Sequence, residues 1–186
     1  MTSTQTDFRE LTGTYTIDPA HSRFGFVARH AMVTKVRGGF NEFEGTTHID
    51  GDDPSKSDVN ITLQVKSVDT RNEQRDGHLR TNDFFDVETY PTITFRSTSI
   101  EHDGGNDFQV TGDLTIKDVT KSVTIPLEFQ GSAKDPFGND RIGFEGSLPV
   151  VRSEYNIAFN AALETGGVLV SDKVTLEFEI SAIKNA

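Results

Sequence analysis

Apolar and polar residues alternate strictly over several stretches of this 186-residue chain. The clearest stretch is residues 58–66, in which Val59, Ile61, Leu63 and Val65 are separated by polar residues. Successive side chains of a β-strand point to opposite faces, so such a stretch predicts a strand with one buried face. A pairing shift of one residue would expose that whole apolar face to water, which constrains the register of the strand.

Similar runs recur along the chain, and short polar turns separate them. The other predicted strands cover residues 15–17, 22–30, 33–43, 92–96, 108–116, 123–129, 142–148 and 174–181. The pair Gly38-Gly39 predicts a bulge or a sharp bend in the third of these strands. About eight to ten antiparallel strands with short turns are typical of a sandwich or of a closed barrel. The residues alone leave both architectures open.

Length and composition indicate one folded domain. Hydrophobic residues make up only 34% of the chain, but 14 residues are Phe, and most of them lie in the alternating runs. The apolar residues are therefore concentrated where a core needs them. Residues 1–12 are polar and mixed, which predicts a loose N-terminal arm before a single domain over residues 13–186.

The charge balance argues against nucleic acid as a partner. The chain has 29 acidic and 18 basic residues, and its formal net charge of −11 repels phosphate backbones and anionic membrane surfaces. Without cysteine it has neither a disulfide frame nor a thiolate ligand. The first residues have no basic and apolar signal segment, and no run approaches about 20 apolar residues. We therefore expect a cytoplasmic protein without stable membrane insertion.

Residues 70–91 interrupt the alternating pattern and predict a short helical lid. Thr70 and Glu73 have the spacing of a capping box, in which a hydroxyl and a carboxylate satisfy the first free amides of a helix. Asp76 and Arg80 lie one turn apart in the order that favours an ion pair. With few apolar residues nearby, this helix is expected to face solvent.

The end of the same stretch carries two adjacent aromatic residues. Asp83 is placed to cap a second helical turn that holds Phe84 and Phe85. Two neighbouring rings on a lid need an apolar surface to cover. We therefore expect both rings to face the interior of the domain.

Catalytic and metal-binding motifs are missing from the sequence. The five histidines are scattered with no two at ligand spacing, and no nucleophile elbow or phosphate-binding glycine loop occurs. The carboxylates of residues 70–91 are better explained as a solvated helix face than as an acid–base pair. We expect a protein that is not an enzyme and that uses no cofactor and no metal.

Two arginines are candidates for holding a polar head group. Arg152 and Glu154 lie beside Tyr155, where they fit either a polar site at a barrel mouth or an ion pair on an edge strand. Arg37, next to Gly38-Gly39, has the same two interpretations.

The order of residues in several segments resembles the YceI-like family. The resemblance is carried by Asn72, Arg75, Asp76, His78, Leu79, Asp83, Phe84, Phe85, Asp86, Tyr90, Pro91, Ile93 and Phe95, and by the segments 15–22, 29–38, 112–121 and 168–174. It covers about the whole chain after Leu11. This family is known as polyisoprenoid-binding, with a lipocalin-like barrel. The resemblance therefore implies an all-β, closed antiparallel lipocalin-like β-barrel of about eight strands with a short helical lid segment.

The resemblance also implies a function. An eight-stranded barrel has an interior that side chains nearly fill or that holds one small ligand. The implied ligand is a long-chain polyisoprenoid or isoprenoid quinone, bound without catalysis in a hydrophobic tunnel for transport, storage or sensing. Because an aromatic stripe alone also fits a packed core, the alternative is a structural or stress-related interaction domain with a filled barrel. Family members are often homodimers, so a homodimer is implied as well.

The predicted site follows from the parity of the strands and from the lid. The predicted tunnel lining consists of Phe24, Phe26, Phe40, Leu63, Phe84, Phe85, Ile93, Phe95, Leu114, Ile116, Val123, Ile125, Phe144 and Leu176. Arg37 and Arg152 are the predicted head-group residues.

Overall fold

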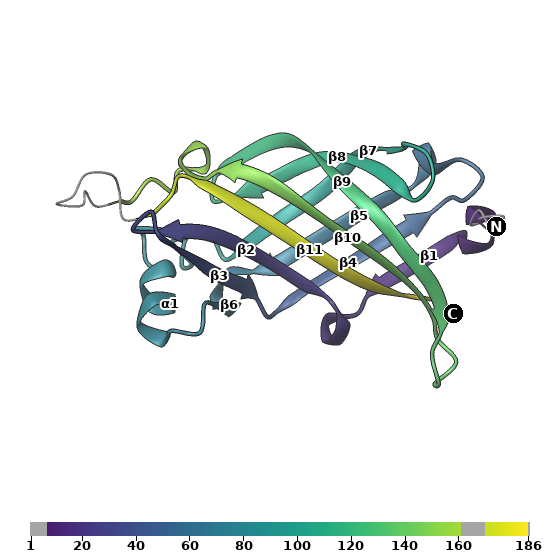
Figure 1. The fold of residues 1–186 in the computed structure, drawn as a ribbon, viewed down its shortest axis with the longest axis horizontal. Helices are drawn as coiled ribbons and strands as arrows, with labels where there is room; N and C mark the ends of the chain where they lie inside the picture. Colours follow the sequence, from purple (N-terminus) through teal and green to yellow (C-terminus); the bar gives the residue numbers. More distant parts are fainter. Residues whose placement is uncertain (1–6, 161–169, 186) are drawn as a thin grey trace.

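The computed structural model describes residues 7–160 and 170–185. Its strands form one antiparallel sheet that closes into an elongated barrel (Figure 1). The strands are β1 (Gly13–Ile17), β2 (Arg23–His30), β3 (Thr34–Phe40), β4 (Phe43–Ile49), β5 (Asp58–Gln64), β6 (Val68–Asp69), β7 (Thr92–His102), β8 (Asp107–Ile116), β9 (Val119–Lys134), β10 (Asp140–Val151) and β11 (Lys173–Lys184). The described residues contain one α-helix, α1 (Glu73–Leu79), and the 3-10 turns η1 (Phe8–Leu11), η2 (Pro19–His21), η3 (Pro54–Lys56), η4 (Val65–Ser67) and η5 (Arg152–Tyr155).

The barrel closes because β11 pairs with β1 as well as with β10. The order β1-β4-β5-β7-β8-β9-β10-β11 is a ring of eight strands, in which Tyr15 pairs with Lys184 and Ile17 with Ala182. Closure removes the unpaired edges that strands of this length would otherwise present. The predicted closed antiparallel barrel is confirmed, and the sandwich is excluded.

Three of the eight strand paths are interrupted. β1 and β2 lie one after the other along β11, β4 and β3 continue beside them, and β5 and β6 come next. The interruptions are η2, the residues Asn41 and Glu42, and η4. The last two lie side by side, because Asn41 N donates a hydrogen bond of 3.2 Å to the carbonyl of Ser67.

The bend predicted at Gly38-Gly39 is wrong. β3 pairs with β2 in one unbroken register that runs from Phe40 opposite Phe24 to Thr34 opposite His30. The interruption comes only after Phe40. A glycine is needed at position 38 for a different reason, which is its close contact with the lid.

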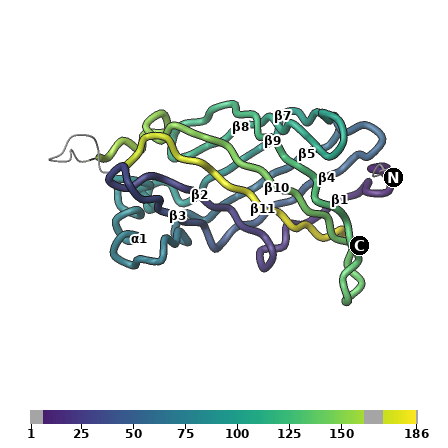
Figure 2. Tube along the Cα trace, in the orientation of Figure 1, coloured from purple at the N-terminus to yellow at the C-terminus, as the bar shows by residue number. Residues whose placement is uncertain are grey.

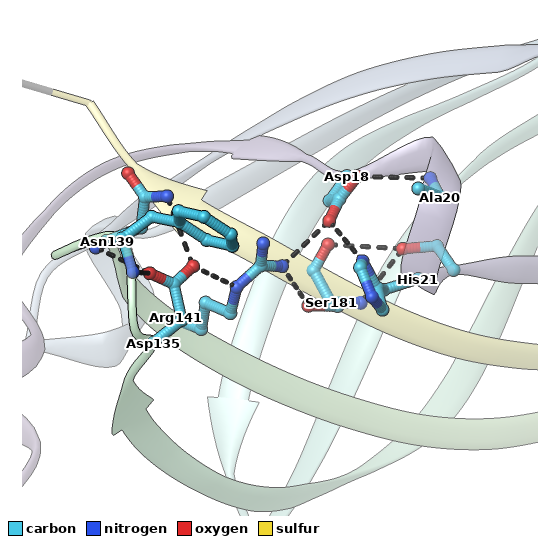
Figure 3. A network of polar contacts seen from close by, with 9 residues as sticks. Asp18, Ala20, His21, Asp135, Asn139, Arg141 and Ser181 are labelled. Carbon is cyan, nitrogen blue, oxygen red and sulfur yellow. Dashed lines mark hydrogen bonds and ion pairs between the residues drawn. The ribbon is translucent and has the colours of Figure 1, made fainter.

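A polar network ties the first interruption to the turn between β9 and β10 (Figure 3). Arg141 donates from Nη1 to Asp18 Oδ2 and from Nε to Asp135 Oδ2, both at 2.7 Å. His21 Nδ1 lies 2.7 Å from the same oxygen of Asp18. The hydrogen bond from Arg141 lowers the pKa of Asp18. Hydrogen bonds from the backbone N–H of Asn139 and, as the second cause, from the guanidinium of Arg141 hold the pKa of Asp135 well below its usual range.

The turn η1 closes one end of the barrel. Figure 2 shows that η1 and α1 lie at opposite ends of the long axis. The rings of Phe8 and Phe129 pack edge-on with their centroids 5.5 Å apart. Tyr15 Oη donates a hydrogen bond of 2.9 Å to the carbonyl of Leu11. Residues 7–12 are therefore packed on the barrel, and the prediction of a loose arm is wrong for them.

Candidate functional site

The barrel interior holds three apolar cavities arranged in sequence from η1 to α1. Their volumes are about 70 Å³ at the η1 end, 80 Å³ in the middle and 110 Å³ at the α1 end. The first and second share Val59, Val110, Leu127 and Ile180, and the second and third share Phe40, Ile93, Ile116 and Leu176. Packed protein cores contain few voids larger than a water molecule. The interior of this barrel is therefore incompletely filled, and its free space runs along the axis.

Thirteen of the fourteen predicted lining residues border at least one of these cavities. Phe24, Leu63, Phe95, Leu114 and Ile125 line the middle cavity, and Phe40, Ile93, Ile116 and Leu176 line the middle cavity and the α1-end cavity. Phe26, Phe84 and Phe85 line only the α1-end cavity, and Phe144 lines the η1-end cavity.

Val123 is the exception. It pairs with Gly112 on β8, where the ring of Phe95 comes within 2.6 Å of the position that a Cβ would take. Val123 instead borders a shallow surface depression together with Lys121 and Glu154. The alternation of β9 correctly predicts that Val123 has the inward parity, but it does not predict that Val123 lies away from the three cavities.

The prediction missed residues at both ends of the interior. Phe8 and Leu11 line the η1-end cavity, and Tyr155 and Ile157 line the α1-end cavity. These residues lie in 3-10 turns and loops, so no alternating pattern marks them. The only available signal was the presence of apolar residues in otherwise polar segments.

The start of α1 differs from the predicted capping box. The N-cap is Asn72, whose Oδ1 accepts a 3.0 Å hydrogen bond from Arg75 N. Asp76 is buried, and its Oδ1 accepts from Thr70 N at 2.8 Å and from Thr70 Oγ1 at 2.5 Å. The hydroxyl of Thr70 therefore satisfies a buried carboxylate and is not free to cap the helix.

The predicted ion pair between Asp76 and Arg80 is also wrong. Arg80 donates from Nε to the carbonyl of Lys66 at 3.0 Å and from Nη2 to that of Val68 at 3.3 Å. The side chain of Arg80, the C-cap residue of α1, thus attaches the end of the helix to β6 and η4. The helix is a fixed part of the barrel end, and the description of it as solvent-facing is wrong for Asp76.

Phe84 and Phe85 lie in the turns that follow α1. The predicted second helical turn is absent at these residues, and Asp83 instead pairs with His78 at 2.8 Å. Phe84 is buried, with its ring edge-on to His78 at 5.1 Å, and the ring of Phe85 meets that of Phe40 at 5.7 Å. Both rings face the α1-end cavity, as predicted for a lid.

Arg152 is buried beside the α1-end cavity. Its Nη1 donates to the carbonyl of Ile157 at 2.8 Å, Nε to that of Ser171 at 2.9 Å and Nη2 to that of Val170 at 3.3 Å. Burial lowers the pKa of its guanidinium, and nearby Asp172 opposes that shift. Arg152 therefore holds together the backbone segments that surround the end of β10.

The surroundings of Glu154 and Arg37 bear on the predicted roles of the two arginines. Glu154 pairs with Lys121 at 3.8 Å, so the predicted ion pair with Arg152 is wrong. Arg37 is exposed on the outer face of β3, because its neighbours Val36 and Gly38 have the inward parity. Its side chain therefore points away from the cavities, and a head-group role for Arg37 stays a prediction.

Neither a metal cluster nor a membrane-spanning helix occurs in the part of the chain that the structure describes. Residues 7–160 and 170–185 contain no group of three or more His, Asp or Glu side chains arranged to hold a metal ion. No helix in the same ranges is long and apolar enough to span a membrane.

These features define the class of the protein. It is a closed antiparallel barrel with three neighbouring apolar cavities in its interior, sealed by η1 at one end and covered by α1 and the following turns at the other. The chain belongs to the YceI-like domain family, whose family model matches residues 15–182.

Similar proteins support this assignment. The chain is 41% identical to a UPF0312 protein of Staphylococcus epidermidis over 171 residues, which cover 90% of this chain and 95% of that protein. The crystal structure of BcnA from Burkholderia cenocepacia matches with a TM-score of 0.79 at 29% identity, covering 89% of this chain and 98% of that one. A polyisoprenoid binding domain from Saccharophagus degradans, implicated in plant cell wall breakdown, has a TM-score of 0.70 at 17% identity and covers 92% and 98%.

Proposed function

We propose that this protein binds one long isoprenoid chain, a polyisoprenoid or an isoprenoid quinone, in the barrel interior without catalysing a reaction on it. The observation that carries the proposal is the row of three apolar cavities along the barrel, in which neighbouring cavities share lining residues. Each buried CH₂ group contributes about 0.8 kcal/mol, so a few isoprene units give several kcal/mol before the cost of association. The polyisoprenoid binding domain of Saccharophagus degradans, which shares this fold, supports the same ligand class.

The orientation of the ligand follows from the two ends of the barrel. Phe8 and Leu11 line the η1-end cavity, and its polar side chains, Thr47, Asp50 and Ser57, already hydrogen-bond to the backbone. The α1-end cavity is bordered by Arg152 and Tyr155, next to the exposed chain around η5. We therefore propose that the tail points toward η1 and the polar end lies near η5.

The distribution of charges supports binding rather than catalysis. Asp50 and Arg152 are the charged residues among the described side chains that line the three cavities, and they lie at opposite ends. Asp50 accepts hydrogen bonds from the backbone N–H groups of Asp52 and Asp53, and Arg152 donates to three carbonyls. General acid–base catalysis needs groups within hydrogen-bond reach of one substrate proton. These two groups do not meet that requirement together.

The test is to extract purified protein with organic solvent and to identify the extract by mass spectrometry. The delipidated protein is then titrated with an isoprenoid quinone and with a saturated fatty acid as a control ligand. We expect a co-purified isoprenoid and binding of one quinone per barrel. If no lipid co-purifies and the quinone does not bind, the filled interaction domain is the correct alternative. A chemically altered quinone after incubation would instead establish an enzyme.

Association and location remain predictions. We expect a homodimer, which sedimentation at high protein concentration tests directly, and a cytoplasmic protein, which fractionation of the source cells tests.

A further inference from the structure

The turn between β2 and β3 exposes two apolar side chains. Met32 is 61% exposed and Val33 75%. The turn is closed by a 3.1 Å hydrogen bond from Val33 N to the carbonyl of His30, and its central residues Ala31 and Met32 have positive φ angles of 50° and 65°. Such turns favour Asn and Gly, because other residues rarely adopt positive φ. This turn presents a large apolar residue where a small polar one would fit more easily.

The outer face of the same hairpin is basic. Residues 19–41 contain four Lys or Arg and no Asp or Glu, although the whole chain has a net charge of −11. Arg29, Lys35 and Arg37 have the outward parity of β2 and β3, and all three are exposed. The hairpin is thus a local exception to an acidic protein.

These three charges lack acidic partners among the described residues. The ion pairs of the described chain involve none of them, whereas Arg23, further along β2, pairs with Glu177 at 3.6 Å. Arg29 and Lys35 lie directly opposite each other across the two strands. Like charges in that position destabilise a sheet, so an anionic partner would relieve a repulsion that is present in the free protein.

The hairpin turn lies at the α1 end of the candidate site. It lies at the same end of the barrel as α1 (Figure 1). Phe26 and Ala28, inward residues of β2 on the path to the turn, line the α1-end cavity. Any surface that the turn contacts is therefore close to the end of the barrel where we place the polar end of the ligand.

We propose that the β2–β3 turn docks this protein on an anionic lipid bilayer. Met32 and Val33 insert among the lipids, while Arg29, Lys35 and Arg37 contact lipid phosphate groups. Short apolar insertions combined with basic residues give reversible binding at a membrane surface. The acidic remainder of the barrel is repelled by the same surface, which fixes the orientation and keeps the contact transient. The inference rests on the proposed function only for its purpose, the transfer of an isoprenoid between bilayer and cavities; docking itself requires no isoprenoid.

The chain has no tryptophan, so a single introduced one reports on the contact. Val33→Trp places it at the turn. Phe137→Trp is the matched control, because Phe137 is 90% exposed in the β9–β10 turn at the opposite end of the barrel (Figure 1). With isoprenoid-free vesicles of phosphatidylcholine and phosphatidylglycerol, we expect a blue shift and quenching by brominated lipid for Val33→Trp alone. An unchanged spectrum of Val33→Trp, or an equal response of Phe137→Trp, would overturn the proposal.

The basic face is tested by removing its charges. In co-sedimentation with the same vesicles, the triple variant Arg29→Gln, Lys35→Gln, Arg37→Gln is expected to bind at least about tenfold more weakly. Lys134→Gln, which removes a charge from the far end, and pure phosphatidylcholine vesicles are the controls. Undiminished binding of the triple variant would overturn the proposal.

The two proposals fail in different ways. Quinone delivered from detergent should bind the triple variant as well as it binds the unchanged protein. Quinone binding without vesicle binding rejects docking alone, and vesicle binding without quinone binding rejects the proposed ligand while docking stands.

Discussion

Arg141 Nη1 lies 2.7 Å from Asp18 Oδ2, and this contact joins the start of β10 to the break between β1 and β2. The two residues are far apart in sequence, and both side chains are largely buried. Because Arg141 also binds Asp135, one guanidinium holds three segments at the surface of the barrel. The closure of the barrel near β1 and β11 thus has an electrostatic component in addition to the strand pairing.

The stability of the protein should therefore fall at acid pH. The pKa values of Asp18 and Asp135 are lowered in the folded state, so their contribution is fully present above the unfolded pKa of about 3.9 and is lost as pH falls through the lowered values. Arg141→Gln removes the main cause of the lowered pKa of Asp18 and, after the backbone N–H of Asn139, the second cause of that of Asp135. We expect a shallower dependence of the free energy of unfolding on pH below about pH 5. Lys134→Gln, at an exposed ion pair with Asp140, is the control and should leave that slope unchanged.

Substitution by alanine at the two glycines near the lid, Gly38 and Gly77, should change the free energy of unfolding in opposite directions. A Cβ on Gly38 would lie 2.5 Å from Phe26 and 2.7 Å from Thr70, which is held by Asp76, so Gly38→Ala should cost about 1 to 3 kcal/mol. Gly77 lies in α1 with nothing within 4 Å of that position, so Gly77→Ala should stabilise by about 0.5 to 1 kcal/mol. Denaturant unfolding measures both, and equal effects would contradict the packing of β3 against the lid.

Added bulk distinguishes a tunnel from a packed core. Ala28 lines the α1-end cavity, so the ring in Ala28→Phe should occupy ligand space. We expect less bound lipid and, in lipid-free protein, a free energy of unfolding within about 1 kcal/mol of the unchanged chain; a filled core would lose about 1 to 3 kcal/mol. Val123→Phe adds a ring away from the three cavities and should leave bound lipid unchanged. Loss of stability in Ala28→Phe with undiminished lipid would reject the tunnel.

The two lid rings should differ in their effect on folding. Phe84 is buried in the main core cluster, and truncation of such a ring costs about 3 to 5 kcal/mol. Phe85 is only partly buried and packs against the core from the side of the cavity. Phe85→Ala is therefore expected to reduce quinone affinity with a smaller loss of stability than Phe84→Ala. The comparison needs unfolding curves and ligand titrations on both variants, and a reversed order would place Phe84 at the ligand and Phe85 in the core.

Strand parity explains how much of the site could be predicted. Residues such as Leu63 and Ile125 alternate with polar neighbours, so their inward direction follows from the period of the strand and from closure of the barrel. Closure itself came from the family resemblance, because alternation is the same in a sandwich. Arg37 shows the opposite case: the alternation of β3 predicts that it points outward, whereas its position beside two glycines suggests a head-group site.

The errors concentrate where side chains bind each other across segments. Thr70 and Asp76 have spacings that fit local helix contacts, but tertiary burial pairs them with each other. The three carbonyl partners of Arg152 are likewise set by how loops meet at the end of β10. A local sequence pattern does not predict such contacts between segments that are distant in the chain. The same holds for Phe8, whose position in an apparently featureless arm gave no sign that it seals the barrel.

The position of Phe8 has a practical consequence for how the protein is handled. Phe8 and Leu11 of η1, together with Gly51 and Pro54 of the β4–β5 connection, line the first cavity, so part of its wall is made by residues outside the sheet. Trimming the chain to begin at β1, as is common when flexible ends are removed before crystallisation, would leave every strand in place. The molecule would nevertheless lose Phe8 and Leu11 from the wall of the η1-end cavity, and water would reach apolar side chains that the longer chain covers.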